Sequence, residues 1–197
     1  SRFVFRSGML MKPMFEAARS TKRRLVLAEG EGGKMLQACQ LIVSEQLADV
    51  TLVGRPHVIE DKIKSMGLSI VPGKDFDIVD NLNDDVITSI GEEYHGLMAR
   101  QGMTPKAAQT RVRANTTVVA SMLLRRGDAD AMLCGTFGTY GKHLKMVDEI
   151  IGRKKECVAC HMADGRGQPG SVPPLAGSDW LDNSDRTIAI VLRGMAG

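Results

Sequence analysis

The chain has 197 residues, of which 43% are hydrophobic and 25% are charged, the balance of a globular protein with a buried core rather than of a disordered chain. Its 26 Lys and Arg stand against 23 Asp and Glu, a net charge of +3, and the basic residues are spread along the chain, which argues against a nucleic-acid-binding face. No apolar run approaches the roughly 20 residues of a membrane span, and the first residues lack a secretory-signal pattern. We therefore expect a cytoplasmic protein with neither a nucleic acid nor a membrane as partner.

Up to residue 153, short β-branched runs alternate with longer helical patterns. This rhythm is typical of βαβ units and predicts an α/β fold, a parallel sheet with helices on both faces. The expected strands are residues 24–28, 49–53, 75–79 and 129–134. The expected helices are residues 34–47, 55–66 and 84–100, one that begins at Thr104-Pro105, one that opens at Asn115 and stops at Gly127, and one that ends near residue 151.

Three of these expectations concern positions in detail. Thr104 is expected to cap a helix with its side chain, because Pro105 loses no hydrogen bond in the first turn. Asn115 is expected to act as a second cap of this kind. The strand at 129–134 is apolar throughout, so we expect it to be buried in the centre of the sheet.

The glycine-rich turn that follows this strand is the best candidate for ligand chemistry. It runs through Gly135-Thr136-Phe137-Gly138-Thr139 and opens a helix that carries Lys142. Free amides and the helix dipole attract an anion at such a position, and the two Thr hydroxyls and Lys142 add donors. The alternative is a turn whose glycines only permit tight packing.

Other candidate ligand sites carry weaker signals. The Gly30–Lys34 string has Ala28 and Met35 where a phosphate loop needs Gly and Ser or Thr, so a plain turn is favoured there. Three arginines either flank the same ligand cleft or, as helix-end arginines more often do, contact solvent or a helix dipole: Arg113, Arg125 and Arg126. Three histidines have no second ligand at metal spacing, and we interpret them as surface or packing residues: His57, His95 and His143.

The chain changes character near residues 153–156, after which Gly, Pro, Ser and Asp dominate. We expect two parts, residues 1–153 as an α/β domain and residues 154–197 as an irregular tail. The tail contains Cys157-Val-Ala-Cys160-His161, the attachment motif of c-type haem, in which His161 would bind the iron. A zinc site would need a second Cys or His pair, which the tail lacks.

The first part resembles the phosphotransacetylase-like domain of large bacterial NADP-dependent malic enzymes. The resemblance rests on six strings in the family's order: RSGMLMKPMFEAAR, LVLAEGE, VTLVGRP, DFDIV, GMTPKAA and RRGDADAMLCGTFGTYGKHL. It implies a domain that binds acetyl-CoA or phosphate, regulates the enzyme and forms homo-oligomers. On this basis the binding residues are expected to be Gly135, Thr136, Gly138, Thr139 and Lys142.

The same resemblance argues against catalysis by this chain. The family's acidic pair and Arg are replaced by Gly32-Gly33-Lys34-Met35, and the half of the family domain that carries acyl transfer has no counterpart here. Catalytic residues therefore stay unassigned, and the catalytic parts of malic enzyme and of phosphate acetyltransferase are both expected to be absent.

The tail resembles a partial class I cytochrome c, through CVACHMADGRGQPGSVPPLAGSDWL and VLRGMAG. This resemblance leaves two alternatives to the regulatory domain: an electron-transfer protein with covalent haem c at Cys157, Cys160 and His161, and a recombined fragment without function. Because haem attachment requires an export compartment, we expect no haem in a cytoplasmic chain. We also expect the tail not to fold as an independent haem domain.

Overall fold

The computed structural model describes residues 12–152 of the chain. Residues 12–20 are helical, and the labelled elements follow in alternation. The strands are β1 (Arg23–Leu27), β2 (Ala48–Val53), β3 (Asp77–Val79) and β4 (Ala131–Leu133). The helices are α2 (Gly33–Ser44), α3 (Pro56–Ser65), α4 (Asp84–Met98), α5 (Pro105–Ala114), α6 (Thr116–Arg126) and α7 (Tyr140–Ile150), with a short 3-10 turn η1 (Ala99–Gln101) after α4.

The strands form a four-stranded sheet in the order β3-β2-β1-β4, and every pairing is parallel. Leu25 of β1 lies opposite Val50 on one side and Ala131 on the other. The chain leaves β1 toward β2 and β3 and then crosses to the opposite edge to form β4. The strand order therefore reverses between β1 and β4, and in open α/β sheets the crevice at the carboxyl ends of two such strands is the usual ligand position.

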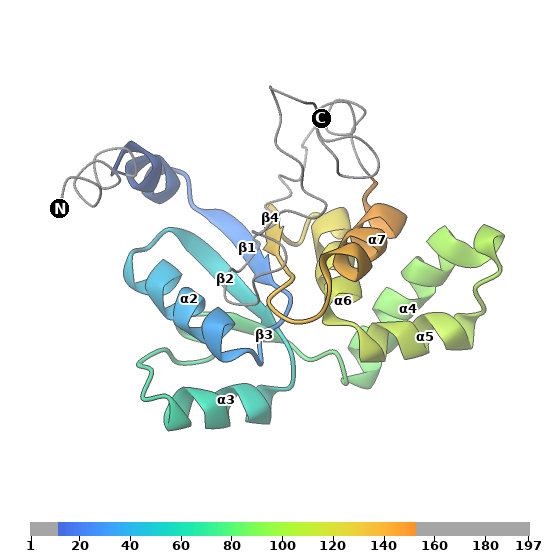
Figure 1. Cartoon of the computed structure of the whole chain (residues 1–197), viewed down its shortest axis with the longest axis horizontal. Helices are drawn as coiled ribbons and strands as arrows, with labels where there is room; N and C mark the ends of the chain where they lie inside the picture. Colours follow the sequence, from blue (N-terminus) through green and yellow to red (C-terminus); the bar gives the residue numbers. More distant parts are fainter. Residues whose placement is uncertain (1–11, 153–197) are drawn as a thin grey trace.

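Helices cover both faces of this sheet (Figure 1), with α2 and α3 on one side and α4 to α7 on the other. Alternation along β1 explains the division, because successive side chains of a strand point to opposite faces. Leu27 packs with α2 and α3, whereas Val26 and Ala28 pack with the second helical layer. Helix α6 is the central element of that layer, since residues 117–124 are all buried.

The α/β prediction is confirmed, and most expected elements lie within a few residues of the observed ones. The helix after Thr104 begins as expected, and the Thr104 hydroxyl accepts a hydrogen bond from the Ala107 amide at 3.2 Å. Asn115 occupies the N-cap position of α6, but its side chain does not cap it. The Asn115 amide instead donates to the Arg111 carbonyl at 3.1 Å, because the last turn of α5 directly precedes it and offers an open acceptor.

The prediction that the fourth strand is central is wrong for the described residues. Strand β4 is shorter than expected, and it lies at one end of the sheet order. Its middle residue Met132 is nevertheless fully buried, because α6 packs across it and Ser121 contacts its sulfur at 3.6 Å. Burial by a helix therefore accounts for the apolar run.

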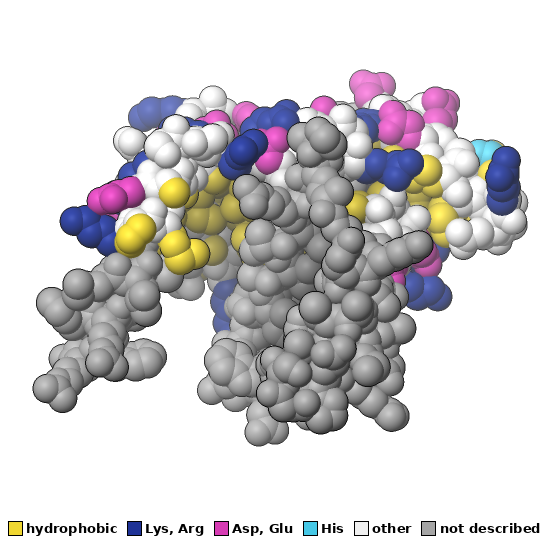
Figure 2. All heavy atoms as spheres, turned by 90° about the horizontal axis from the view of Figure 1, so that it is seen from above, with side chains coloured by type: hydrophobic (Ala, Val, Ile, Leu, Met, Phe, Trp, Pro, Cys, Tyr) yellow, Lys and Arg dark blue, Asp and Glu magenta, His cyan; other side chains and the backbone are white. Residues whose placement is uncertain are grey.

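The surface of residues 12–152 carries charges of both signs. On the face seen in Figure 2, Lys and Arg side chains are interspersed with Asp and Glu side chains. Among the described helices, none combines the length and the apolar character needed to cross a bilayer. The predicted tail and its boundary at 153–156 lie outside the described residues.

Candidate ligand site at the carboxyl edge of the sheet

The sequence Glu29-Gly30-Glu31 follows β1 and Ala28, and its two carboxylates reach loops on opposite sides of the strand. Glu29 binds the turn that follows β4, and Glu31 binds the start of α3. Gly30 fits between them because the strands are too close for a side chain. A Cβ atom at Gly30 would lie 2.8 Å from the Val53 carbonyl oxygen and 2.9 Å from the Leu52 Cβ.

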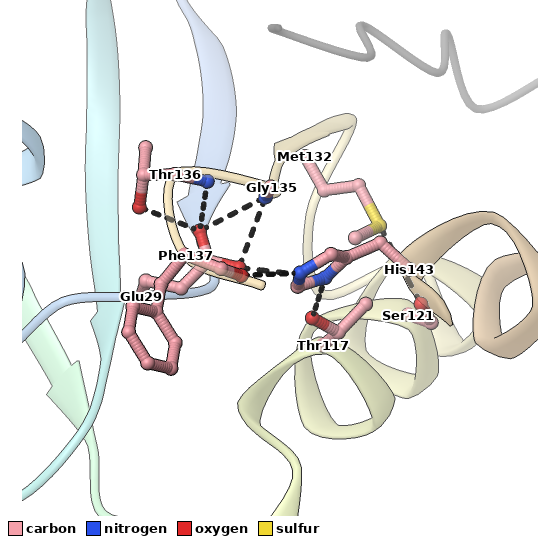
Figure 3. Close-up of polar contacts among 8 residues, drawn as sticks. All are labelled: Glu29, Thr117, Ser121, Met132, Gly135, Thr136, Phe137 and His143. Carbon is pink, nitrogen blue, oxygen red and sulfur yellow. Dashed lines mark hydrogen bonds and ion pairs between the residues drawn. The ribbon is translucent and has the colours of Figure 1, made fainter. Parts of the chain in front are cut away.

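The Glu29 carboxylate lies against the glycine-rich turn after β4 (Figure 3). The Gly135 amide donates to its two oxygens at 3.0 and 3.1 Å, and the Thr136 hydroxyl donates at 3.1 Å. The Thr136 amide contributes a longer bond of 3.4 Å. Because the Glu29 side chain is only 13% exposed, these donors replace most of the water that a carboxylate requires.

His143, near the start of α7, also contacts the glycine-rich turn after β4. Its Nε2 lies 2.6 Å from the Phe137 carbonyl oxygen, which can only accept, so Nε2 carries the proton. In the neutral ring Nδ1 then accepts from the buried Thr117 hydroxyl at 2.8 Å. Through these two bonds the imidazole joins α6, α7 and the turn. Glu29 Oε1 lies nearby, 3.6 Å from Nδ1.

On the other side of β1, Glu31 binds Arg55 in the connection between β2 and α3. Arg55 Nε and its terminal guanidinium nitrogen each donate to Glu31 at 2.8 Å, and the Arg55 amide donates at 3.0 Å. The Lys62 ammonium donates to the Glu31 carbonyl. The bond from the Arg55 guanidinium is the main reason that the pKa of Glu31 lies below its ordinary value. Glu31 therefore places a negative charge beside the start of α3, where the helix dipole favours it.

The predicted binding residues lie in the turn after β4 and in the first turn of α7, but they differ in their contacts. Gly135 and Thr136 face inward and already donate to Glu29. Gly138, Thr139 and Lys142 are exposed, although a Cβ at Gly138 would point toward His143 Nε2. The inner amides are therefore occupied by a carboxylate of the protein itself, and only the outer face of the turn is open to solvent.

The three arginines hold helices together and do not converge on this turn. Arg113 pairs with Asp84 at 2.7 Å, Arg126 donates to Glu93 at 2.7 Å, and Arg125 donates to the Ile150 carbonyl at the end of α7 at 2.9 Å. Only Arg125 contacts a helix end, as expected of such arginines. Arg113 and Arg126 instead pair with carboxylates of α4. Of the histidines, His57 is exposed and His95 is half-buried, whereas His143 is buried and has specific polar partners.

Sequence reasoning missed Glu29, Thr117 and His143 as parts of one network. The available signal was the position of Glu29, a carboxylate placed directly after an apolar strand. Cys134, next to the turn, is buried, and burial raises its pKa to about 12, so it is an unreactive thiol. The motif residues Cys157, Cys160 and His161 lie outside the described residues. Among residues 12–152, no group of three or more metal-ligating side chains is close enough to hold an ion.

Comparison with known proteins gives a consistent relationship. The family model described as phosphate acetyl/butaryl transferase matches residues 9–162. Over 154 residues the chain is 47% identical to the NADP-dependent malic enzyme of Haemophilus influenzae, and over 155 residues it is 43% identical to the NAD-dependent malic enzyme of Rhizobium meliloti. Each match covers 78% of this chain but only 20% of the enzyme. The chain thus spans about a fifth of these relatives.

Solved structures agree on the fold. The EutD phosphotransacetylase from Staphylococcus aureus superposes with a TM-score of 0.64 at 17% identity, covering 74% of this chain and 44% of that one. A phosphotransacetylase from Streptococcus pyogenes gives a TM-score of 0.61 at 20% identity. On the extent of the family match and the identity to the malic enzymes, the chain belongs to the phosphate acetyl/butaryl transferase family, as a domain of the type found in bacterial malic enzymes.

Proposed function

We propose that this chain contains a regulatory domain of a malic enzyme, which binds an acyl-CoA or phosphate and carries out no acyl transfer by itself. The observation that carries the proposal is the 47% identity to a malic enzyme over 154 residues. Identity to phosphate acetyltransferases is lower, at 30% over 142 residues for that of Clostridium acetobutylicum. The ligand position is the turn after β4, at the reversal of strand order.

The contacts of this turn favour binding over catalysis. Attack by a thiol or hydroxyl needs a general base with a free acceptor atom. Both nitrogens of His143 are engaged, by Phe137 and Thr117, and the Glu29 oxygens accept from backbone amides. Thr117 is 2% exposed, and its hydroxyl is bonded to the imidazole. Neither a base nor a nucleophile is therefore presented to a ligand by this network.

Calorimetry with acetyl-CoA and with inorganic phosphate tests the proposal, together with an assay for acetyl-CoA formation from acetyl phosphate and coenzyme A. We expect saturable binding without turnover. A Gly138→Val variant should bind more weakly, because Gly138 has a φ of +94° and a Cβ there would lie 3.2 Å from His143 Nε2. Equal affinity of the two proteins would remove the turn from the site, and turnover would contradict the absence of catalysis.

Electron transfer is the second candidate, favoured by the Cys157-Val-Ala-Cys160-His161 string alone. It predicts a haem-stained band that survives denaturing electrophoresis and a ferrous cytochrome c spectrum. A Cys157→Ser and Cys160→Ser double variant is the matched control, because it removes both thioether positions. A protein that neither binds haem nor responds to acetyl-CoA or phosphate would correspond to the remaining alternative, a recombined fragment without function.

A further inference from the structure

The turn after β4 carries an aromatic side chain, Phe137, that is largely exposed among the described residues. Phe137 is 84% exposed, more than any other large hydrophobic side chain in residues 12–152. The next are Met14 at 62% and Leu41 at 59%, both on helices. Exposed apolar surface of this kind is unfavourable in water and often marks a binding contact.

The backbone that carries this ring is held on both sides. Glu29 binds the amides of Gly135 and Thr136, which precede the ring, and His143 binds the Phe137 carbonyl itself. Figure 3 shows the carbonyl directed at the imidazole and the phenyl ring directed away from it. A ring displayed from a fixed backbone loses little conformational entropy when a ligand packs on it.

The outer face presents side chains of three kinds that can contact a nucleotide. It presents the Phe137 ring, the exposed Thr139 hydroxyl and the exposed Lys142 ammonium within six residues. An aromatic ring stacks on a purine base, and a lysine pairs with phosphate. Because Glu29 occupies the inner amides, an anionic ligand meets the turn from this outer side.

We propose that the outer face of this turn binds the nucleotide end of acyl-CoA, with the Phe137 ring stacked on the adenine and Lys142 beside a phosphate. The inference rests on the proposed function and deepens it, since it makes Phe137 the residue that distinguishes acyl-CoA from free phosphate. It also replaces the expectation that the Gly135 and Thr136 amides bind the ligand directly.

Calorimetry on wild type, Phe137→Ala and Phe137→Tyr tests the assignment, with three probes: acetyl-CoA, the adenosine bisphosphate that forms the nucleotide end of coenzyme A, and inorganic phosphate. Phe137→Ala should weaken both adenine-containing probes by about tenfold, the usual contribution of one stacked base. Phosphate affinity should not change. Phe137→Tyr should retain the wild-type affinities, because it keeps the ring.

Leu41→Ala on α2 is the matched control, since Leu41 is also an exposed apolar side chain but lies outside the turn. It should leave every affinity unchanged. If wild type binds acetyl-CoA and Phe137→Ala binds it equally well, this inference fails and the proposed function stands. If wild type binds phosphate but not acetyl-CoA, this inference fails and the proposed function stands. If wild type binds neither probe, both fail. If Phe137→Ala changes only the oligomeric state in sedimentation, the ring is a subunit contact and the inference is overturned.

Discussion

Glu29 illustrates how a single side chain fixes two segments that are 106 residues apart in sequence. Its carboxylate replaces water for the Gly135 amide and for the Thr136 amide and hydroxyl. Glu29→Ala leaves these donors without their charged acceptor in a half-buried position. We expect it to lower the free energy of unfolding by about 2 kcal/mol, the value typical of hydrogen bonds to charged groups.

Urea denaturation measures this loss. The control is Glu60→Ala, which changes an exposed glutamate of α3 and should stay within about 0.5 kcal/mol of wild type. Equal stability of Glu29→Ala and Glu60→Ala would show that water replaces the carboxylate without cost.

Asp130, just before β4, binds Arg24 of β1 at the amino-terminal end of the two strands. Its carboxylate accepts from the Arg24 amide and the Arg24 guanidinium, each at 2.8 Å. The bond from the guanidinium is the main reason that the pKa of Asp130 is lowered to about 2. A lowered pKa in the folded state stabilises the protein at pH values above the unfolded pKa of about 4.

This stabilisation should disappear as the pH falls from about 4 to about 2, where Asp130 takes up a proton in both states. We expect Asp130→Asn to be less stable than wild type near neutral pH and to approach it over that interval. Chemical denaturation of both proteins across the pH range measures the difference. A difference that does not depend on pH would show that the charge of Asp130 contributes nothing.

At the scale of elements, we expect the Thr104 cap to stabilise α5. The Thr104 hydroxyl accepts from the Ala107 amide, whereas the Thr110 hydroxyl, later in the same helix, donates to the Lys106 carbonyl. Thr104→Ala should therefore cost about 1 kcal/mol of stability. Thr110→Ala should be neutral or slightly stabilising, because alanine has the higher helix propensity. Thermal unfolding of the two variants compares them directly, and equal melting temperatures would contradict the capping role.

Strand β4 depends on α6 for its burial. Met132 is 0% exposed and its sulfur lies 3.6 Å from the Ser121 hydroxyl. Met132→Asp places a charge without a cationic partner in this layer, which costs several kcal/mol and should unfold the domain. Met132→Leu should fold, because it conserves volume. Circular dichroism melts distinguish the two, and an unchanged melt of Met132→Asp would show that β4 is not buried.

At the scale of the whole domain, one sheet separates two apolar layers that contain one free cysteine each. Cys39 packs with α2 and α3, and Cys134 packs with α4 to α7. Burial raises the pKa of each thiol to about 12, so neither reacts as a thiolate in the folded state. Because both layers share β1 and β2, we expect them to unfold together.

Thiol labelling measures this cooperativity in a Cys157→Ser and Cys160→Ser background, with Cys39→Ala or Cys134→Ala to leave one site each. Cys39 in one variant and Cys134 in the other should show the same free energy of opening, equal to the global free energy of unfolding. Faster labelling of Cys134 would show that the helical layer over β4 opens by itself.

The elements were predictable because their signals are local. Gly127 stops α6 in a left-handed conformation with a φ of +82°, and Thr104-Pro105 starts α5 through its own side chain and ring. The family relationship was also accessible, since six short strings in one order carry it. The side chain of Asn115 was not predictable in this way, because two helix ends compete for it.

The amino-acid sequence by itself determined the alternation of strands and helices, the parallel α/β class and the position of the glycine-rich turn, because all three follow from periodicity and turn residues that are close along the chain. Only the tertiary structure decided that β4 lies at one end of the described sheet, that Glu29 and His143 engage that turn, and that Phe137 is left on its outer face. These features depend on contacts between residues up to 106 positions apart, and no local pattern specifies which distant donor a carboxylate will meet when the sheet forms.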